Sequence, residues 1–389
     1  MKIFHTADWH LGKLVQGVYM TDDQRYVIEQ FVQAIDEEKP DAIIIAGDLY
    51  DRALPPVAAV NLLDESLAKM VLKRNIPVLA IAGNHDSPTR VQFGSTLMKE
   101  AGLHIAGELR ADMQPVVLQD EHGEVHFHLI PFAEPSIVKE VFGDDTITTY
   151  DEAMKKVTEH IQATMDPNAR HIAIAHAFVT PNGEKADNTC DSERPLAIGG
   201  SECVSARYFE PFHYTALGHL HRAHYVLHEK IRYSGSLLKF SSSEATHEKG
   251  FLVIDLAADG KVEIDKRIFK PLRDLRIVEG TLQEILRHEP SEDYVFVRLT
   301  DITPIVGAME QIRSVYTNAM HVERKVIRNE RVEEESFVAR EQLDDVSMFK
   351  AFYEQMTGAV ASETAQAIFE EVLQDMLAED RESQEVTNK

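Results

Sequence analysis

The sequence predicts a layered α/β protein followed by a smaller α+β segment and terminal helices. Up to about Lys270, short runs rich in β-branched residues alternate with helical stretches, as in layered α/β domains. Residues 43–45 and 78–81 are apolar without polar alternation, which is expected for strands covered on both faces. Near Pro271 the pattern changes, and the final segment has helical periodicity. We therefore divide the chain into residues 1–270, 271–340 and 341–389.

In the first segment, strands are predicted at residues 2–6, 41–46, 77–82, 126–131, 171–175, 214–217, 231–234 and 251–256. Thr21 or Asp22 is placed to cap a helix that runs to about Glu38. Pro55 and Pro56 precede a second helix that reaches about Arg74.

In the second segment, strands are expected at 273–279, 294–300 and 322–329, with helices at 282–288 and 303–315. Residues 347–379 are predicted to be helical. Apolar residues of that helix share one face, and such a face is more often packed on its own protein than offered to a partner. They are Ile368, Phe369, Val372, Leu373 and Met376.

Composition limits the function classes. The formal charge of −25 argues against a protein that grips nucleic acid through its global field. The acidity is uneven: residues 341–389 carry a net charge of −9, residues 271–340 carry −3, and residues 1–270 carry −13. A polyanion would therefore meet local basic patches.

The cysteine count and the apolar runs bear on location. The 2 cysteines, Cys190 and Cys203, exclude a disulfide scaffold and favour a reducing cytoplasm. We expect no cleavable signal before the first motif, and no apolar run approaches the roughly 18 residues of a membrane span.

Seven candidate metal ligands follow the predicted strands in chain order. They are Asp8, His10, Asp48, Asn84, His176, His219 and His221. Each lies at the carboxyl end of an apolar run, the edge of an α/β sheet where active sites collect. Carboxylate, imidazole and amide ligands without a thiolate suit a pair of hard or borderline divalent cations. Two such cations held about 4 Å apart are the common device for attack on a phosphorus ester, so the ligand series predicts a phosphoesterase.

Single motifs are weaker than the series. Asp8 and His10 flank Trp9 and would share one face of an extended strand. A strand-end Asp such as Asp48 is more often a helix cap, and His176 alone is more often a satisfied core histidine. The order of all seven ligands at strand ends favours the functional interpretation.

The motif series D-x-H, G-D-x-x-D, G-N-H-D, H and G-H-x-H resembles the calcineurin-like metallophosphoesterase superfamily. Within it, residues 5–12 (HTADWHLG), 46–51 (AGDLYD), 82–87 (AGNHDS), 216–222 (ALGHLHR) and 233–236 (YSGS) are similar to the SbcD family of nuclease subunits. The likeness is close over the first segment and looser afterwards. It implies two mixed β-sheets flanked by helices, a small α+β capping domain over residues 271–340, and C-terminal helices.

The resemblance also implies roles for the ligands. Asp8, His10 and His221 would hold a first metal, and Asn84, His176 and His219 a second, with Asp48 bridging the two. Mn²⁺ suits these ligands by availability, although iron or zinc could occupy them.

The remaining candidate residues surround this series. His85 is the candidate proton donor to the leaving oxygen. Asp51 matches the position whose side chain orients that histidine, although a turn-forming Asp is the alternative. Arg52 and Arg90 are candidate phosphate contacts, and a solvated surface role is at least as common for each.

Three functions follow as hypotheses. The resemblance implies a homodimeric DNA nuclease that forms a heterotetramer with an SMC-like ATPase of the SbcC type and acts on double-strand ends and hairpins. In that case residues 341–389 would dock on the ATPase. The second hypothesis is a phosphatase or phosphodiesterase with the same metal core, which the roughly 120 residues after that core disfavour, since a small hydrolase does not need them. The third is a non-catalytic scaffold, which the complete ligand series disfavours.

Overall fold

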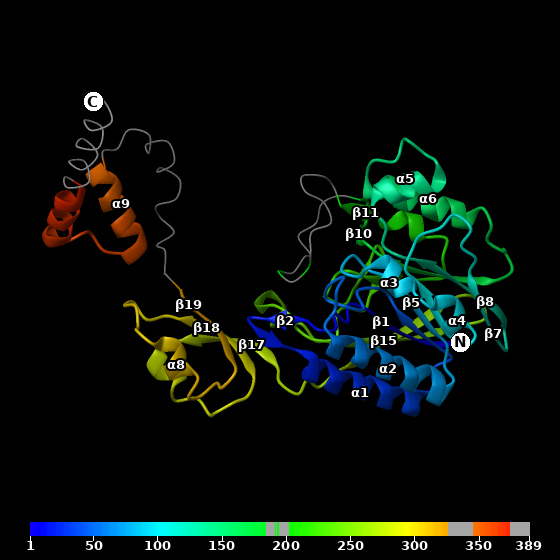
Figure 1. The fold of residues 1–389 in the computed structure, drawn as a ribbon, viewed down its shortest axis with the longest axis horizontal. Coiled ribbons are helices and arrows are strands. Elements are labelled where there is room, and N and C mark those ends of the chain that lie inside the picture. Colours follow the sequence, from blue (N-terminus) through cyan, green and yellow to red (C-terminus); the bar gives the residue numbers. More distant parts are fainter. Residues whose placement is uncertain (184–190, 192, 194–201, 326–344, 374–389) are drawn as a thin grey trace. The chain divides into compact units, whose positions relative to one another are not determined.

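The computed structural model describes residues 1–183, 191, 193, 202–325 and 345–373. The chain forms two compact units. The first comprises Met1–Ile277 with Ser291–Phe296 and Asn318–Met320, and the second contains the rest of the chain. Each unit is described separately below, and Figure 1 shows their elements.

The first sheet of the first unit has six strands and a mixed topology. Its order is β16 (Val262–Ile268), β15 (Gly250–Leu256), β1 (Lys2–Thr6), β4 (Ala42–Ile45), β5 (Val78–Ile81) and β6 (Leu103–Ala106). β1, β4, β5 and β6 are parallel, whereas β15 and β16 continue the sheet in antiparallel fashion. The parallel strands read as continuous apolar runs because both of their faces are covered.

The second sheet also has six strands. Its order is β13 (His224–Val226), β14 (His228–Tyr233), β12 (Tyr214–Gly218), β9 (Arg170–His176), β8 (Gly123–Ile130) and β7 (Val116–Asp120). The four inner strands are parallel, and the two outer strands are antiparallel to their neighbours. Two mixed sheets are thus confirmed as the architecture.

Helices cover the outer faces of the two sheets. The core between the sheets is apolar and includes Ile44 and Ile81 from the first sheet and Phe127 and Ile174 from the second. On the far side of the first sheet pack α1 (Thr21–Glu38) and α2 (Val57–Arg74). On the far side of the second pack α5 (Pro135–Phe142) and α6 (Tyr150–Gln162). The result is a four-layered unit (Figure 1).

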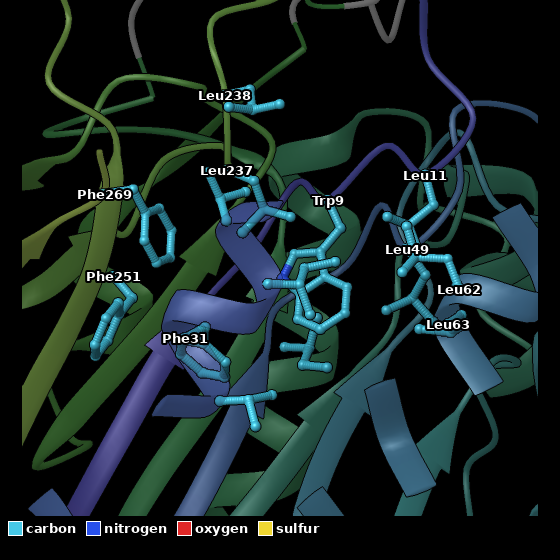
Figure 2. Packing of buried hydrophobic residues seen from close by; sticks show 14 of the residues in the cluster. Trp9, Leu11, Phe31, Leu49, Leu62, Leu63, Leu237, Leu238, Phe251 and Phe269 are labelled. Carbon is cyan, nitrogen blue, oxygen red and sulfur yellow. The ribbon is translucent and has the colours of Figure 1, made fainter. Parts of the chain in front are cut away.

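The core beneath α1 and α2 anchors the loop that follows β1. Figure 2 shows Trp9 among apolar side chains such as Phe31 of α1, Leu62 of α2 and Phe251 of β15. Trp9 is fully buried, and its ring nitrogen donates to the Thr6 hydroxyl at 3.0 Å. Because Trp9 separates Asp8 from His10, its burial holds both candidate ligands in place.

Short elements complete the first unit. They are β2 (Leu14–Val15), β3 (Val18–Tyr19), α3 (Pro88–Gln92), α4 (Ser95–Lys99), β10 (Phe178–Thr180), β11 (Cys203–Ser205), η1 (Ala206–Phe209) and η2 (Ser242–Glu244). The predicted surface loop at 180–200 lies largely outside the described residues.

The predicted cap of α1 is wrong. The N-cap residue is Met20, which makes no side-chain capping hydrogen bond, and the helix already includes Thr21 and Asp22. Asp23, one residue further, is buried and accepts hydrogen bonds from Tyr294 and Arg273. The acidic residues of this first turn therefore do not cap the helix. Their negative charges are favourable at the positive end of the helix dipole, and Asp23 also makes a tertiary contact.

The later strands and helices differ from prediction in their limits. The three-stranded sheet has the order β17 (Leu275–Gly280), β18 (Tyr294–Leu299) and β19 (Ala319–Arg324). β19 begins three residues before the predicted strand at 322–329, whose end lies outside the described residues. The helices α7 (Leu282–Ile285) and α8 (Ala308–Ile312) are shorter than predicted.

The terminal helix is interrupted. α9 (Asp345–Thr357) ends before Gly358, which has a φ of 71°, and a second helix covers residues 363–373. The rings of Phe349 and Phe369 stack at 4.2 Å and join the two helices. Ile368 and Val372 are exposed, so these side chains do not pack into a core of their own; Met376 lies outside the described residues. In the part of the chain described, no helix combines the length and apolarity needed to cross a membrane.

Candidate metal centre

The seven predicted ligands converge from five parallel strands. Asp8 and His10 follow β1, Asp48 follows β4, and Asn84 follows β5. From the second sheet, His176 is the last residue of β9, and His219 and His221 follow β12. The carboxyl ends of these strands meet at one edge of the unit, as the sequence predicted.

The loops that carry the ligands have unusual backbone conformations. Asp8, His10, Asp48 and His219 have positive φ values of 52°, 45°, 51° and 103°. Non-glycine residues adopt such values where surrounding contacts enforce them, and they cluster at functional sites. Main-chain hydrogen bonds hold the first two of these residues: Asp8 N donates to Gly47 O at 3.1 Å, and His10 N donates to Asp48 O at 2.9 Å.

Glycines permit the close approach of the loops. A Cβ atom on Gly47 would lie 2.3 Å from Nδ1 of His176, and Gly47 also has a φ of 91°. A Cβ atom on Gly218 would lie 1.8 Å from the carbonyl oxygen of Ala46. Any side chain at either position would therefore separate the two sheets at the site.

Asp48 occupies the centre of the cluster. Its Oδ2 lies 3.5 Å from Nε2 of His10 and 3.4 Å from Nε2 of His176. Nε2 of His10 is in turn 3.0 Å from Nε2 of His221. One carboxylate oxygen thus faces histidines from both predicted ligand sets.

The second set gathers around the amide of Asn84. Its Oδ1 lies 2.9 Å from Nε2 of His176 and 3.2 Å from Nδ1 of His219. Asp8 connects the two sets, because its Oδ1 accepts from the backbone N–H of His219 at 2.9 Å.

The donor atoms fit divalent cations. Groups of described side chains suited to a metal are Asp8 with His10 and His221, Asp8 with Asp48 and His176, and His10 with Asp51 and His85. In each group the ligand atoms lie within 4.8 Å of one another. Oδ2 of Asp8 and Nδ1 of His10 are buried without a hydrogen-bond partner, which is costly unless a further group satisfies them. Metal ions at this cluster would satisfy Asp8 and neutralise its charge.

Burial controls protonation of the histidines. It lowers the pKa of His10 well below the ordinary value, and it lowers the pKa of His219 to about 3. Both imidazoles are therefore neutral near pH 7 and can act as ligands. Burial also disfavours the charged form of His176, but Asp48 outweighs this effect and raises the pKa of His176 to about 9. A cation bound there must replace that proton.

The two buried carboxylates differ. Burial raises the pKa of Asp8 to about 6. Burial would also raise the pKa of Asp48, but the charge and hydrogen bond of His176 hold it well below its ordinary value. Asp48 is therefore the stronger anion and the better candidate for contact with two cations.

His85 lies beside the cluster. Its backbone N–H donates to Oδ1 of Asp48 at 2.9 Å, and its ring meets that of His10 edge-on with centroids 4.7 Å apart. Nδ1 of His85 is 2.8 Å from the backbone carbonyl of Asp51, an acceptor that fixes the proton on Nδ1. The other ring nitrogen is then the one available for proton transfer.

The Asp51 side chain is placed differently from the prediction. Its Oδ1 pairs with Nζ of Lys13 at 2.8 Å and lies 3.8 Å from Nδ1 of His10. The hydrogen bond to His85 comes from the Asp51 main chain. The sequence could not distinguish these cases, because a residue's carbonyl and carboxylate occupy the same position in the motif.

The two candidate phosphate contacts are not equivalent. Arg52 is half exposed, and its guanidinium lies 3.7 Å from Oδ2 of Asp51 at the edge of the cluster. Arg90 is exposed on α3. Lys13, which was not selected from the sequence, lies closer to the Asp51 carboxylate than Arg52 does, with its Nζ 2.8 Å from Oδ1.

Sequence reasoning also missed two supporting residues. The buried carboxylate of Asp86 accepts from the backbone N–H groups of Leu49, Tyr50 and Gly83, so it joins the loops after β4 and β5. Gln24 of α1 donates to the carbonyl oxygen of His10 at 2.8 Å. Asp86 stands in the G-N-H-D motif and could have been noticed there, whereas Gln24 has no local signal.

Comparison with known proteins agrees with this geometry. The family model described as calcineurin-like phosphoesterase matches residues 1–222. A second model, that of the SbcD C-terminal region and described as the type 5 capsule protein repressor C-terminal domain, matches residues 271–357. The SbcD subunit of the nuclease SbcCD from Staphylococcus epidermidis is 36% identical over 361 residues, which are 92% of this chain and 94% of that protein. The chain belongs to the SbcD family of calcineurin-like phosphoesterases.

Two solved structures are also similar. The crystal structure of TT1561 from Thermus thermophilus is 12% identical, covers 68% of this chain and 98% of its own, and has a TM-score of 0.37. A dimetal phosphatase from Danio rerio is 11% identical, covers 69% and 96%, and has a TM-score of 0.39.

Proposed function

We propose that this chain is the nuclease subunit of a complex with an SMC-like ATPase of the SbcC type. It would cut DNA as a double-strand exonuclease and as a single-strand or hairpin endonuclease, in the cytoplasm, during DNA repair, recombination and replication. The observation that carries the proposal is the convergence of seven candidate ligands, with Asp48 at their centre, in a chain related to an SbcD protein along nearly its whole length.

The ligands divide between two cations. We assign Asp8, His10 and His221 to the first and Asn84, His176 and His219 to the second, with Asp48 bridging them. Contacts of Asp48 with both His10 and His176 support this assignment. We propose Mn²⁺ as the natural metal, by availability. When bound, two such cations activate water and neutralise the phosphodiester.

His85 would protonate the leaving oxygen. It lies next to the ligand Asn84 but hydrogen bonds to the main chain of Asp51 and to the carboxylate of Asp48. These bonds hold the ring of His85 beside His10 and leave its other ring nitrogen, Nε2, available to transfer a proton. The Asp51 carboxylate would act through Lys13, whose ammonium it holds at the edge of the site.

DNA would meet local basic groups near the centre. Arg52 and Arg90 are the proposed phosphate contacts, and Lys13 adds a third cation. Residues 271–340 would form the capping domain that helps to hold DNA. The formal charge of −25 disfavours strong binding by the isolated chain, so we expect the ATPase to increase affinity.

The C-terminal helices would dock on the base of the ATPase coiled coil. Apolar side chains are exposed along them and on the segment that joins them, namely Met348, Phe352, Val360, Ile368 and Val372. Exposed apolar residues on paired helices are typical of a surface that a partner covers. Truncation after Arg340 should abolish co-purification with the ATPase and leave the Mn²⁺ content of the first unit unchanged. Retained co-purification would place the interface elsewhere.

We also propose a homodimer, and a heterotetramer with two ATPase chains. Tyr26, Ile28 and Phe31 of α1 are candidates for a dimer face, but Ile28 and Phe31 are buried in the core and cannot serve. Large apolar side chains are instead exposed at Val57 of α2, Phe93 after α3 and Leu97 of α4. Sedimentation of Phe93→Ser and Leu97→Ser variants would show whether this surface joins two copies.

One assay tests the proposed function most broadly. Mn²⁺-dependent degradation of linear and hairpin DNA should be measured beside a generic phosphodiester, with and without the ATPase. We expect DNA cleavage that chelation abolishes and that the ATPase stimulates. Cleavage of the generic ester alone would favour a phosphatase or phosphodiesterase, and no cleavage of either with both metals bound would favour a scaffold.

A further inference from the structure

A buried ion pair lies directly behind one of the proposed ligands. Glu244, at the end of η2, has no exposed surface, and Lys249, just before β15, is 7% exposed. Neither belongs to the ligand series, and both are separated from His221 by more than twenty residues in sequence. The fold alone brings them together.

Glu244 contacts the imidazole of His221. Its Oε1 lies 3.3 Å from Nδ1 of His221. The same oxygen accepts from the backbone N–H of Phe240 and the hydroxyl of Ser241, both at 3.2 Å. Because the carboxylate is fixed by these bonds, it determines the orientation of the ring.

Lys249 binds the main chain of His221. Its Nζ donates to the carbonyl oxygen of His221 at 2.8 Å, to the hydroxyl of Ser236 at 2.9 Å, and to Oε2 of Glu244 at 2.5 Å. These bonds use all three donors of the ammonium group. Side chain and main chain of His221 are thus fixed by one pair.

The group that faces Nδ1 of His221 differs from those that face Nδ1 of His176 and His85. Nδ1 of His176 faces the carbonyl oxygen of Ala46 at 2.9 Å, and Nδ1 of His85 faces that of Asp51. His221 instead has a buried carboxylate at Nδ1. A proton held on Nδ1 by Glu244 leaves the lone pair of Nε2 directed at the cluster, 3.0 Å from Nε2 of His10.

A buried ion pair is weak evidence for stability, because apolar residues of similar volume often replace it without loss. A carboxylate behind a metal-binding histidine has a specific chemical effect, since it fixes the tautomer and raises the basicity of the ligand nitrogen. Lys249 offsets the negative charge that Glu244 places behind His221.

We infer that Glu244 and Lys249 form a positioning pair that strengthens cation binding at the first of the two proposed sites, through His221. The inference rests on the proposed assignment of His221 as a ligand. It predicts that the two sites differ in affinity and that only the first depends on this pair.

Mn²⁺ binding to the purified chain tests the inference. Titration calorimetry, together with electron paramagnetic resonance of free Mn²⁺, should resolve two binding events. Glu244→Gln retains the shape of the side chain and loses its charge. We expect it to weaken one event about 10- to 100-fold, the effect typical of such supporting groups, and to leave the other unchanged. Glu248→Gln, on an exposed neighbour, should change neither event.

A second variant keeps the test valid if the single substitution destabilises the fold. Glu244→Leu combined with Lys249→Met removes both charges and fills the same space. We expect the double variant to fold, as judged by its circular dichroism and thermal melting without metal, and to show the same selective loss.

Two results would overturn the inference. One is unchanged Mn²⁺ binding in a folded variant; the other is equal weakening of both events in parallel with a lower melting temperature. These measurements do not depend on DNA cleavage. Failure of the proposed nuclease function would appear as a wild-type chain that binds two Mn²⁺ ions and leaves DNA intact.

Discussion

The second sheet carries two groups of histidines, and β9 contributes one residue to each, yet the surroundings of the groups differ. On β9, His176 ends the strand at the metal cluster, whereas His171 lies near the strand's start. His171 contacts His128 of β8, with Nδ1 3.0 Å from Nε2, and its backbone N–H donates to His213 at 2.9 Å. His126, opposite His171 in the sheet register, completes this second group.

The partners of the two groups explain their different roles. Nε2 of His171 faces a main-chain carbonyl, that of Asp166, at 2.8 Å. The carboxylate nearest the group is that of Glu124, which contacts His126 and is itself exposed. At the metal cluster, the buried carboxylates of Asp8 and Asp48 stand among the imidazoles. Convergence of buried carboxylates with histidines, more than the number of histidines, marks the metal site.

Replacement of Asp48 should have the largest effect and should distinguish the metal cluster from the second histidine group most clearly. Asp48→Ala should empty both metal sites, because its carboxylate faces both ligand sets, and DNA cleavage should fall to the level of the chelated protein. Metal analysis by mass spectrometry would measure this loss. His171→Gln, in the second group, is the matched control and should retain both ions. Two equivalents of Mn²⁺ in Asp48→Ala would refute the bridge.

His85→Ala sharpens the comparison within the metal cluster. Loss of a proton donor should reduce cleavage about 10²- to 10⁴-fold, the usual contribution of general acid catalysis. Both metals should remain, since His85 is not a proposed ligand. Single-turnover rates at saturating Mn²⁺, together with metal content, give the answer. Loss of one ion would make His85 a ligand.

The second histidine group should matter for stability alone. His171→Phe leaves Nε2 of His128 without its partner, so unfolding free energy should fall by about 1–3 kcal/mol, the cost of an unsatisfied buried polar group. Urea denaturation with metal present would measure the change. If the variant lost a metal instead, the two groups would not be independent.

The smallest effect concerns pH. Burial, followed by the neighbouring His171 and His126, lowers the pKa of His128 to about 3 from an ordinary value of 6.5. As pH falls, the unfolded chain binds a proton at His128 before the folded chain does. The contribution of neutral His128 to the free energy of unfolding is therefore fully present above pH 6.5 and is lost as pH falls towards 3. Protonation of His128 in the unfolded chain should make the free energy of unfolding about 1 kcal/mol lower at about pH 5.5 than at pH 7. His128→Gln should remove that part of the acid sensitivity; parallel stability curves for both proteins would contradict it.

Much of the first unit could be predicted from local pattern. The three isoleucines at 43–45 and the run at 78–81 are strands because apolar residues without alternation suit a sheet covered on both faces. Strands with alternating exposure such as β16 were missed, although their period of two was visible. The capping box of Thr149 and Glu152 was a similar overlooked signal for α6.

Prediction of the candidate site was limited by distance along the chain. The ligands could be found because each lies at the end of a strand or within four residues after it. Glu244, Lys249 and Gln24 support ligands only through the folded structure, and no sequence spacing links them to His221 or His10. The Asp51 side chain was assigned to His85 because sequence cannot tell whether a residue acts through its carboxylate or its carbonyl.

The central claim is a pair of cations bridged by Asp48. Crystals soaked in Mn²⁺ and measured at the manganese absorption edge test it directly. We predict two anomalous peaks about 4 Å apart, one beside His10 and His221 and one beside His176 and His219, with the Asp48 carboxylate between them. A single peak, or peaks away from this cluster, would contradict the account.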